Sequence, residues 1–454
     1  MKKKLVVLSV DSLFDEDMEF LKTLPNFKKI LDQGCYAEGG MRSVYPSFTY
    51  PAHASIITGT WPEFHGIYHN EKLDVGNPSP DWYWYHKDLK VDTILDVAHR
   101  QGLTTACVGW PCMGADPNVD WLVAEIWPEN DKVDPRPILK TGCSENMFEA
   151  GGVMERHWHK LRKTTQPFMD HMMVGASCDI IRRYQPDILF IHLAHLDHTR
   201  HANGIHGPAV NQAIIANDDW LGRLMEAAMD AGVYEDTNFA VISDHGHLPV
   251  KQMFNPNVLL AEEGFIRLDG NGRIASWDAY CNSTSLSCQV VLKDPADKEV
   301  RDKLEALLYQ MRKNPAYGVE CVYNKEEVEK EQHLTGDFEY VLEGMAGTSF
   351  GAACTGEVLV KPDNSDYKFS VASHGHLPHK GPQPVFMIAG PDVKKGAVIP
   401  RQRIIDEAPT FAKIFGFDLP DAKGTFYEKK RSFGNERIAD DLAAVRMRRR
   451  PGGR

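Results

Sequence analysis

The sequence predicts an α/β fold: a three-layer sandwich with a central, mostly parallel β-sheet between helices and a small α+β subdomain inserted into it. Two observations carry this prediction. Short apolar runs rich in β-branched residues are typical of strands that are buried on both faces of a parallel sheet. Segments with apolar residues at three- and four-residue spacing alternate with these runs, as helices alternate with strands in layered α/β proteins.

Four apolar runs are the clearest candidate strands, and two segments are the clearest candidate helices. The strands are expected at residues 5–10, 188–193, 239–242 and 385–388. One helix is expected from the four-residue spacing of Phe168, Met172, Ala176 and Ile180. The other is expected from the apolar positions Val210, Ile214, Leu221 and Leu224, ahead of a glycine at 232 that is suited to end it.

The stretch 255–365 differs in character from the rest and predicts the inserted subdomain. It contains a strand-like run at 286–292 and a charged, amphipathic helix with apolar residues at Val300, Leu304, Leu307 and Met311. We therefore expect one α/β domain over residues 1–440, interrupted by the insertion at 255–365. The arginine-rich residues 441–454 are expected to form a solvated basic tail.

The charge balance excludes some classes of partner. The 51 Lys and Arg residues against 63 Asp and Glu residues give a net charge of -12. A chain without excess positive charge is a poor general binder of nucleic acid polymers or of anionic membranes. No apolar run reaches the ~18 residues of a membrane span, so no membrane association is expected.

The location predicted from the sequence is cytoplasmic. The apolar run after the first four residues covers residues 5–10 and ends at Asp11. This run is shorter than the ~7–15 apolar residues of an export signal, and no small-residue cleavage site follows. The nine cysteines form no C-x-x-C pair and leave one unpaired in any full disulfide scheme. Reduced thiols are the usual state of cysteines in a cytoplasm.

Three of the four predicted strands lead into an aspartate. The runs 5–10 and 239–243 are followed directly by Asp11 and Asp244, and the run 188–193 leads shortly to Asp197. The carboxyl ends of strands in an open α/β sheet line the ligand crevice, so these carboxylates are expected to converge on one site. A single aspartate in such a place is usually a cap for the next loop or helix, but three together favour a site.

Histidines accompany two of these aspartates. His201 follows Asp197 by four residues, which places both side chains on one side of a helical turn, and His245 follows Asp244 directly. The pentapeptide His-Gly-His-Leu-Pro occurs twice, at 245–249 and 374–378, so that His374 matches His245. Mixed carboxylate and imidazole ligands suit zinc, manganese or iron, and six such groups suggest two divalent ions.

The other histidines have weaker claims. His247 and His376, the second histidines of the repeated pentapeptide, are expected either to support the ligands from outside or to have no role. Surface or core positions, or at most supporting ones, are expected for the remaining histidines near the site: His192, His195, His198 and His206.

A candidate nucleophile lies in the hydroxyl-rich segment 45–59, at an expected loop-to-helix junction. Free backbone N–H groups and the positive end of a helix dipole would support a phosphoryl group there. An aliphatic hydroxyl needs a base or a metal to react at neutral pH. Spacing alone does not choose between Ser47 and Thr49.

Taken together, these motifs resemble the type I phosphodiesterase/nucleotide pyrophosphatase branch of the alkaline phosphatase superfamily. Segments 24–27, 41–59 and 61–70 are similar to the amino-terminal signature of that family. Asp197 with His201, and the segments 243–246, 373–375 and 406–410, are similar to its later motifs. The resemblance spans about residues 5 to 415 and implies an alkaline-phosphatase-like fold.

The resemblance also implies roles for individual residues. One zinc-type ion would be held by Asp11, Asp244, His245 and the Thr49 hydroxyl, and the other by Asp197, His201 and His374. Thr49 would be the nucleophile, and Asn70 would donate a hydrogen bond to a phosphoryl oxygen. Such a protein would hydrolyse phosphodiester or nucleotide pyrophosphate bonds through a phosphothreonine, because two ions ~4 Å apart stabilise both the attacking and the leaving oxygen.

Departures from the family pattern bear on the substrate, which is expected to be a small phosphorylated molecule, with a nucleotide as one candidate. Tyr50 and Trp110 match positions where relatives have pocket residues, and they serve either as substrate contacts or as wall packing. Alkaline phosphatases proper add an arginine for the monoester charge. The Thr49 motif holds none, which favours diesters or pyrophosphates unless Arg42 or Arg200 enters the site.

Three alternatives stay open on the sequence: phosphonate cleavage of the phosphonoacetate hydrolase kind, a phosphomonoesterase, and a metal-dependent binding protein without turnover. A sulfatase would need a C-x-P-x-R motif, and Cys112 is followed by Met113-Gly114-Ala115. The presence of Thr49 and all six proposed ligands favours an enzyme over a binding protein. The sequence does not predict an oligomeric state.

Overall fold

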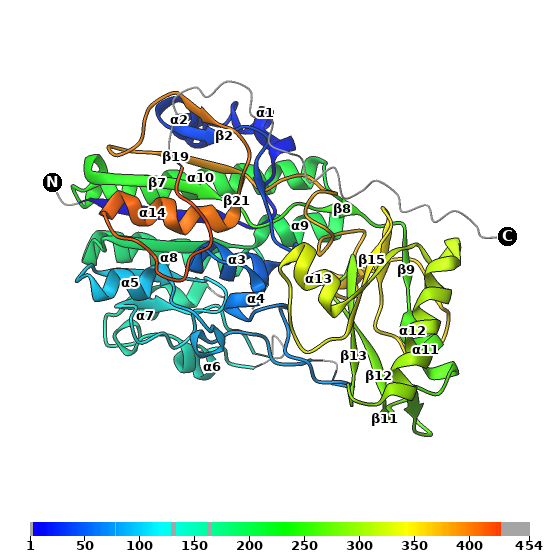
Figure 1. Cartoon of the computed structure of the whole chain (residues 1–454). Helices are drawn as coiled ribbons and strands as arrows, with labels where there is room; N and C mark the ends of the chain where they lie inside the picture. Colours follow the sequence, from blue (N-terminus) through cyan, green and yellow to red (C-terminus); the bar gives the residue numbers. More distant parts are fainter. Residues whose placement is uncertain (1–2, 78, 129–132, 161–164, 428–454) are drawn as a thin grey trace.

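The computed structural model describes residues 3–77, 79–128, 133–160 and 165–427. The predicted basic tail at 441–454 lies outside the described residues. The chain folds into a large α/β body and a smaller lobe beside it, which is drawn in green and yellow in Figure 1. Both terminal parts of the described chain belong to the large body.

An eight-stranded sheet forms the centre of the large body. Its strand order is β20-β2-β19-β7-β1-β6-β4-β5. The five strands from β7 to β5 run parallel, whereas β19 is antiparallel to both of its neighbours. The strands are β1 (Lys4–Val10), β2 (Cys35–Ala37), β4 (Thr105–Val108), β5 (Trp121–Val123), β6 (Ile188–Leu193), β7 (Thr237–Ile242), β19 (Phe386–Ala389) and β20 (Ala397–Ile399).

Alternating side chains of these strands enter two separate cores. In β1, Val6 and Leu8 pack on one face of the sheet, whereas Leu5 and Val7 pack on the other. The same alternation holds in β6, where Leu189 and Phe190 belong to different cores. A sheet that is apolar on both faces must be covered on both, and this accounts for the continuously apolar runs in the sequence.

Helices cover the two faces as the cores require. The helices α2, α8 and α10 supply apolar residues to the core that contains Leu8, and α3, α5 and α14 supply the core that contains Val7. Figure 1 shows α10 on one side of the strands and α14 on the other. The helices of the large body are α1 (Met18–Leu21), α2 (Pro25–Gln33), α3 (Thr49–Thr58), α4 (Pro62–His65), α5 (Ile94–Arg100), α6 (Arg136–Gly142), α7 (Val153–His157), α8 (Phe168–Tyr184), α9 (His195–Asn203), α10 (Pro208–Asp230) and α14 (Glu407–Phe415).

The smaller lobe has an antiparallel four-stranded sheet of order β12-β13-β15-β14 and a core of its own. The three-stranded sheet β16-β9-β17 and the hairpin β10-β11 lie in the same part of the chain. Its elements are β9 (Gln252–Phe254), α11 (Pro256–Glu262), β10 (Ile266–Leu268), β11 (Ile274–Trp277), β12 (Ala279–Ser283), β13 (Ser287–Leu292), α12 (Lys298–Lys313), β14 (Val319–Asn324), α13 (Lys325–Gln332), β15 (Tyr340–Gly344), β16 (Thr348–Phe350) and β17 (Leu359–Val360).

Buried contacts join the lobe to the large body. Tyr45 and Leu377 from the body pack with Val291, Val328 and other apolar residues of the lobe in one cluster. The Tyr45 hydroxyl also donates a hydrogen bond to Glu343 Oε2 at 3.0 Å. Two short ladders complete the fold, between β3 (Met41–Arg42) and β21 (Gln402–Arg403) and between β8 (Leu248–Pro249) and β18 (Ala372–Ser373).

The predicted fold class is confirmed, with differences in detail. The four clearest predicted strands correspond to β1, β6, β7 and β19, and the two clearest helices correspond to α8 and α10. The strand-like run and the amphipathic helix predicted within 255–365 correspond to β13 and α12. The direction of β19 was not predictable from its apolar run. Among the described residues, no helix combines the length and the apolar character needed to cross a bilayer.

Candidate active site

The three strand-end aspartates meet at one edge of the parallel sheet. Asp11 directly follows β1, and its N–H donates to the carbonyl of Leu193 at the end of β6. Asp244 lies just beyond β7, the other neighbour of β1. Asp197 lies in the first turn of α9, which begins after β6. Adjacent parallel strands therefore bring together residues that are far apart in the chain, such as Asp11 and Asp244.

Asp11, Asp244, His245 and Thr49 form the first group of side chains. His245 Nε2 lies 3.0 Å from Asp244 Oδ2, 3.4 Å from Asp11 Oδ1 and 3.3 Å from Thr49 Oγ1. The two carboxylates and the imidazole have ligand atoms close enough to surround one ion. This group brings together four residues that the family resemblance assigns to one metal.

Asp197, His201, His374 and His247 form the second group. From the Asp197 carboxylate, His201 Nε2 lies at 3.3 Å, His247 Nε2 at 3.4 Å and His374 Nε2 at 3.7 Å. His201 and His374 each donate their Nδ1–H to a backbone carbonyl, of Ala372 and of Ser47, so that the Nε2 lone pairs face the carboxylate. A metal-binding histidine is usually oriented in this way. The His245 and His374 rings stack at 3.8 Å, which places the two groups side by side.

The repeated pentapeptide explains how these histidines meet. In the ladder of β8 and β18, Leu248 lies opposite Ser373, so that His247 and His374 are neighbours across two antiparallel strands. Both glycines of the repeat lie where another backbone segment leaves no room for a side chain. A Cβ atom at Gly246 would lie 2.2 Å from the carbonyl oxygen of Pro382, and one at Gly375 would lie 2.0 Å from that of Thr284. The ladder of β8 and β18 thus sets the two copies side by side, and each glycine allows a further backbone segment to pass close to its copy.

Thr49 is the first residue of α3, and its hydroxyl is free for chemistry. The N-cap residue of α3 is Phe48, so Thr49 is not the residue whose side chain would cap this helix. The helix end offers fewer free donors than the sequence suggests. The N–H of Tyr50 donates to Asn70 Oδ1 at 2.9 Å, position 51 is proline, and the N–H of Ala52 donates to Phe48. Because Asn70 Oδ1 is an acceptor, its amide NH₂ is the group left to act as a donor.

Burial and mutual repulsion make the carboxylates a poor match for a site that contains no cation. Burial, with the charges of Asp244 and Asp197, raises the pKa of Asp11 well above its usual value, and burial raises the pKa of Asp244 to about 7. Burial alone would raise the pKa of Asp197, but the neighbouring His201 and His374 outweigh this effect and lower it. Burial and the neighbouring His374 lower the pKa of His245.

Unpartnered atoms in both groups fit divalent cations. The atoms Asp11 Oδ1, Asp244 Oδ2, Asp197 Oδ1, His201 Nε2 and His247 Nε2 are buried without a hydrogen-bond partner in the described part of the chain. Buried polar atoms are normally paired, and clustered oxygen and imidazole nitrogen atoms are ligands of zinc, manganese and iron. Thr49 and Asp197 are the members with appreciable exposure, at 9% and, for the side chain, 15%. The site therefore opens to solvent beside the hydroxyl and Asp197.

Two further histidines support the first group. His192 lies with Nε2 3.2 Å from Asp11 Oδ2 and with Nδ1 3.0 Å from the carbonyl of Gly109. His53 donates its Nδ1–H to the carbonyl of Thr49 at 2.9 Å and lies 3.5 Å from Asp244 Oδ2. His192 thus occupies a supporting position, which was one of the two positions expected for it from the sequence. His53 was not singled out, because on the sequence it is one more residue of a helix.

The other histidines near the motifs lie outside both groups. His195 and His198 lie on α9 but are not among the candidate ligands. His206 is paired with Glu16 at 3.1 Å. His376 packs beside Gly381, and its carbonyl accepts from the N–H of Ser47.

The aromatic residues exposed near the site are not Tyr50 and Trp110, the two that the sequence suggested. Trp110 has no exposed surface and packs edge-on against His53 and Phe190, and Tyr50 is equally buried. A ring without exposed surface does not contact a ligand in this conformation, so the structure favours wall packing for both. Instead, half-buried rings lie beside the site: the ring centre of Trp82 is 4.9 Å from that of Trp127 and 5.5 Å from that of Tyr367. Trp82 and Trp127 come from irregular segments and Tyr367 begins a single 3-10 turn (Tyr367–Phe369), and such segments give no periodic signal.

Arg200, one of the two arginines considered for a monoester charge, is committed elsewhere. Its guanidinium is fully buried, donates to Asp17 Oδ2 at 2.6 Å and lies over the ring of Phe14. Arg42 lies on β3, in the short ladder with β21. Neither the first nor the second group contains an arginine.

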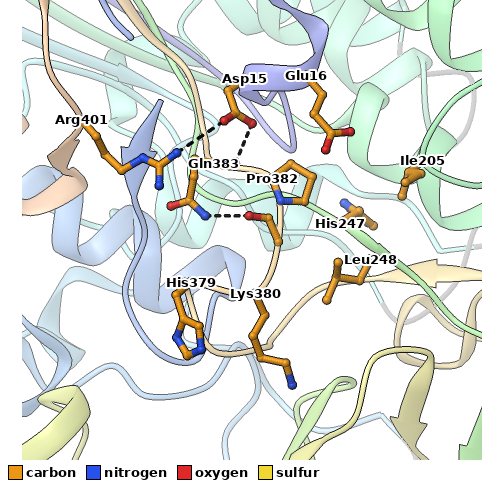
Figure 2. Close-up of a pocket in the computed structure, with 11 residues that line it drawn as sticks. Asp15, Glu16, Ile205, His247, Leu248, His379, Lys380, Pro382, Gln383 and Arg401 are labelled. Atoms are coloured by element: carbon orange, nitrogen blue, oxygen red, sulfur yellow. Dashed lines mark hydrogen bonds and ion pairs between the residues drawn. The ribbon is translucent and has the colours of Figure 1, made fainter. Parts of the chain in front are cut away.

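A pocket of about 330 Å³ borders the second group on another side, and Figure 2 shows His247 and Leu248 in its wall. Asp15 is paired there with Arg401 at 3.8 Å. Apart from His247, none of its lining residues belongs to either group of candidate ligands, so it is not the opening at Thr49.

Known proteins resemble this chain in both sequence and fold. The family model of type I phosphodiesterase/nucleotide pyrophosphatase matches residues 5–367. An ectonucleotide pyrophosphatase/phosphodiesterase of Caenorhabditis elegans is 26% identical over 431 residues, covering 92% of this chain and 43% of that protein. Ectonucleotide pyrophosphatase/phosphodiesterase family member 1 of Homo sapiens is 28% identical over 243 residues, covering 50% of this chain and 22% of that protein. The chain thus spans less than half the length of these curated relatives.

A solved structure supports the same relationship at the level of fold. Murine ectonucleotide pyrophosphatase/phosphodiesterase 5, an inactive variant in complex with AMP, matches with a TM-score of 0.65 at 18% identity, covering 93% of this chain and 97% of that one. At that identity the likeness concerns the alkaline-phosphatase-like fold. The family model matches most of the chain, including every candidate carboxylate and imidazole ligand except His374, and it shows more: this chain belongs to the type I phosphodiesterase/nucleotide pyrophosphatase family.

Proposed function

We propose that this protein hydrolyses a phosphodiester or pyrophosphate bond of a small substrate, with Thr49 as the nucleophile. The observation that carries the proposal is the position of Thr49 Oγ1, at the start of α3 and 3.3 Å from His245 Nε2. Next to this hydroxyl lie two groups of carboxylates and imidazoles with unpartnered ligand atoms. A binding protein would have no need of a hydroxyl placed in this way.

Two divalent ions, most simply zinc, fit the two groups. Asp11, Asp244 and His245 with Thr49 would hold one, and Asp197, His201 and His374 would hold the other. When bound, such ions lower the pKa of a hydroxyl or of water and offset the negative charge of a phosphoryl group. The supporting bonds of His192 to Asp11 and of Nδ1 in His201 and His374 to carbonyls hold these ligands in place.

The residues of the chain perform a displacement in two steps. The Thr49 hydroxyl gives up its proton and its oxygen forms a bond to phosphorus, while the bond from phosphorus to the leaving oxygen breaks and that oxygen keeps the electron pair and takes up a proton from solvent. Water then attacks phosphorus in the phosphothreonine, the bond from phosphorus to Thr49 Oγ1 breaks, and a proton from this water restores the threonine hydroxyl. The NH₂ of Asn70 would donate to a non-bridging oxygen, whose charge is greatest in the transition state.

Aromatic rings favour a substrate with a flat group, and a nucleotide is the leading candidate. Trp82, Trp127 and Tyr367 are half-buried, and Tyr367 lies within 6.0 Å of both Phe48 and His201. A flat base stacks well on such rings. The murine relative bound to AMP supports the same substrate class.

The cytoplasmic location stays a prediction. One ground for it is cysteine usage, and in the described part of the chain none of the nine cysteines forms a disulfide. The relatives named above carry the prefix "ecto" in their names.

Replacing Thr49 by alanine tests the nucleophile. Thr49→Ala removes the attacking oxygen, so turnover of an aryl phosphodiester should fall at least about a thousand-fold. Three carboxylate or imidazole ligands remain in its group, so the metal content should stay near that of the parent protein. Thr49→Ser is the matched control, because it keeps the hydroxyl and should keep measurable activity. An alanine variant that turns over at the parent rate would show that another group attacks phosphorus.

A side-by-side assay tests the substrate class. An aryl phosphodiester and a dinucleotide pyrophosphate should give kcat/KM at least about ten-fold above that of an aryl phosphomonoester, since Arg200 is held by Asp17. Phosphonoacetate serves as the test of phosphonate cleavage. A preference for the monoester or the phosphonate would overturn the proposed diester specificity. Inactivity on all four with metal bound would favour a binding protein.

Trp82→Ala tests the aromatic rings. Loss of a stacking partner should raise KM for a nucleotide diester about ten-fold, corresponding to ~1.4 kcal/mol, with a smaller change in kcat. Trp121→Ala is the control, because Trp121 lies in the edge strand β5 and stacks on Tyr184, not on the rings of the proposed pocket. Equal KM values in the parent protein and the Trp82 variant would remove this ring from the substrate pocket.

A further inference from the structure

The second group contains one histidine more than the family resemblance assigns to it. Asp197, His201 and His374 were expected there, and His247 completes a set of four whose ligand atoms lie within 4.8 Å of one another. His247 Nε2 is 3.4 Å from Asp197 Oδ1, and its ring centre lies 4.6 Å from that of His201 and 5.0 Å from that of His374. Its place follows from the ladder of β8 and β18, not from spacing along the chain.

The orientation of His247 matches that of the two neighbouring histidines. In His201 and His374, Nδ1 is bonded to a backbone carbonyl and Nε2 points at Asp197. In His247, Nδ1 lies 2.6 Å from Ser12 Oγ and Nε2 points at the same carboxylate. A carbonyl partner makes Nδ1 the donor and leaves Nε2 free to bind a metal in His201 and His374, and the Ser12 hydroxyl can accept from Nδ1 of His247 in the same way. All three rings therefore present Nε2 to one point beside Asp197.

A role as a hydrogen-bond donor to Asp197 accounts less well for this arrangement. Nε2 of His247 and Oδ1 of Asp197 both lack a hydrogen-bond partner among the described residues, although they are only 3.4 Å apart. His247 is fully buried, and an unpaired imidazole nitrogen in such a place is unfavourable. A cation between the two atoms would satisfy both of them.

Ser12 holds His247 in this position at a conformational cost. Its backbone has φ +64°, a left-handed conformation that is unfavourable for serine by about 1 kcal/mol. In this conformation the N–H of Ser12 donates to Asp244 Oδ1 at 3.2 Å, while its hydroxyl reaches His247. One residue thus connects a ligand of the first group with a member of the second, and strain of this kind is typical of functional sites.

We infer that His247 is a fourth protein ligand, through Nε2, of the divalent ion at Asp197, His201 and His374. The inference rests on the proposed function, because it presupposes that an ion binds there. Three imidazoles and one carboxylate would make a set of four protein ligands, which zinc can extend to five when an oxygen of the substrate binds. The two groups would then differ: the Asp197 group would bind its ion more tightly, and its three imidazoles would favour zinc over manganese.

Zinc affinity measures the contribution of His247. Zinc is titrated into stripped protein in competition with a chelator, which resolves the dissociation constants of the two ions. His247→Ala should raise one of them at least about ten-fold and leave the other within about two-fold. His376→Ala is the matched control, because it removes the corresponding histidine of the repeated pentapeptide and should change neither constant. Unchanged constants in a folded His247 variant would overturn the inference.

A crystal structure of the unaltered protein with zinc separates a ligand from a supporting residue, and it needs no variant to fold. Anomalous scattering locates the ions, and the inference predicts a distance of ~2.0–2.1 Å from His247 Nε2 to the ion at Asp197. A distance beyond about 3 Å with both ions present would overturn this inference alone. Absence of zinc from both groups in saturating zinc would overturn the metal sites of the proposed function as well.

Discussion

The close approach of three aspartates at the carboxyl ends of adjacent strands is the constraint on which the site depends. Asp11, Asp244 and Asp197 are buried together, and burial and repulsion raise the pKa values of the first two. Buried carboxylates without a counter-charge are strongly unfavourable, so the fold is compatible with these residues mainly if cations join them. Bound cations would explain the unpartnered ligand atoms and the nearby hydroxyl of Thr49. They also agree with the family to which the chain belongs.

The smaller lobe contributes to this site through the segment that connects it back to the sheet. His374 follows β18, and its carbonyl accepts from the N–H of Leu286 in the lobe, while its Nδ1–H is bonded to Ser47 just ahead of Thr49. Tyr367, which comes from the same returning segment, donates to Glu71 beside Asn70. The lobe therefore helps to position the second group and the edge of the substrate opening. Its treatment as a separate domain stays a prediction.

What the sequence could predict was local or followed from the ends of strands. Apolar runs identified β1, β6 and β7, and the site residues were recognisable because an aspartate follows each of these strands within four residues. Which hydroxyl faces the site, Ser47 or Thr49, was indicated by the resemblance and not by spacing. The structure places Thr49 Oγ1 beside His245, whereas the Ser47 hydroxyl donates to the carbonyl of Val44.

What the sequence could not predict depends on contacts between distant segments. The place of His247 is set by the pairing of Leu248 with Ser373, and a periodic pattern within either segment says nothing about this register. Trp110 lies in a motif-like segment, but its burial is decided by the packing of α3 against the sheet. Trp82 and Trp127 meet through irregular loops. The residues that shape substrate choice are therefore the ones for which the tertiary structure was needed.

The most direct test of the central claim is the thermal unfolding midpoint, Tm, of chelator-stripped protein as zinc is added. A ligand that binds only the folded state stabilises it by mass action. The account predicts a Tm that rises with zinc and levels off at about two ions per chain, because the repulsion among Asp11, Asp244 and Asp197 is relieved. A Tm that does not change with zinc would contradict it, since the three buried carboxylates would then be stable together without a cation.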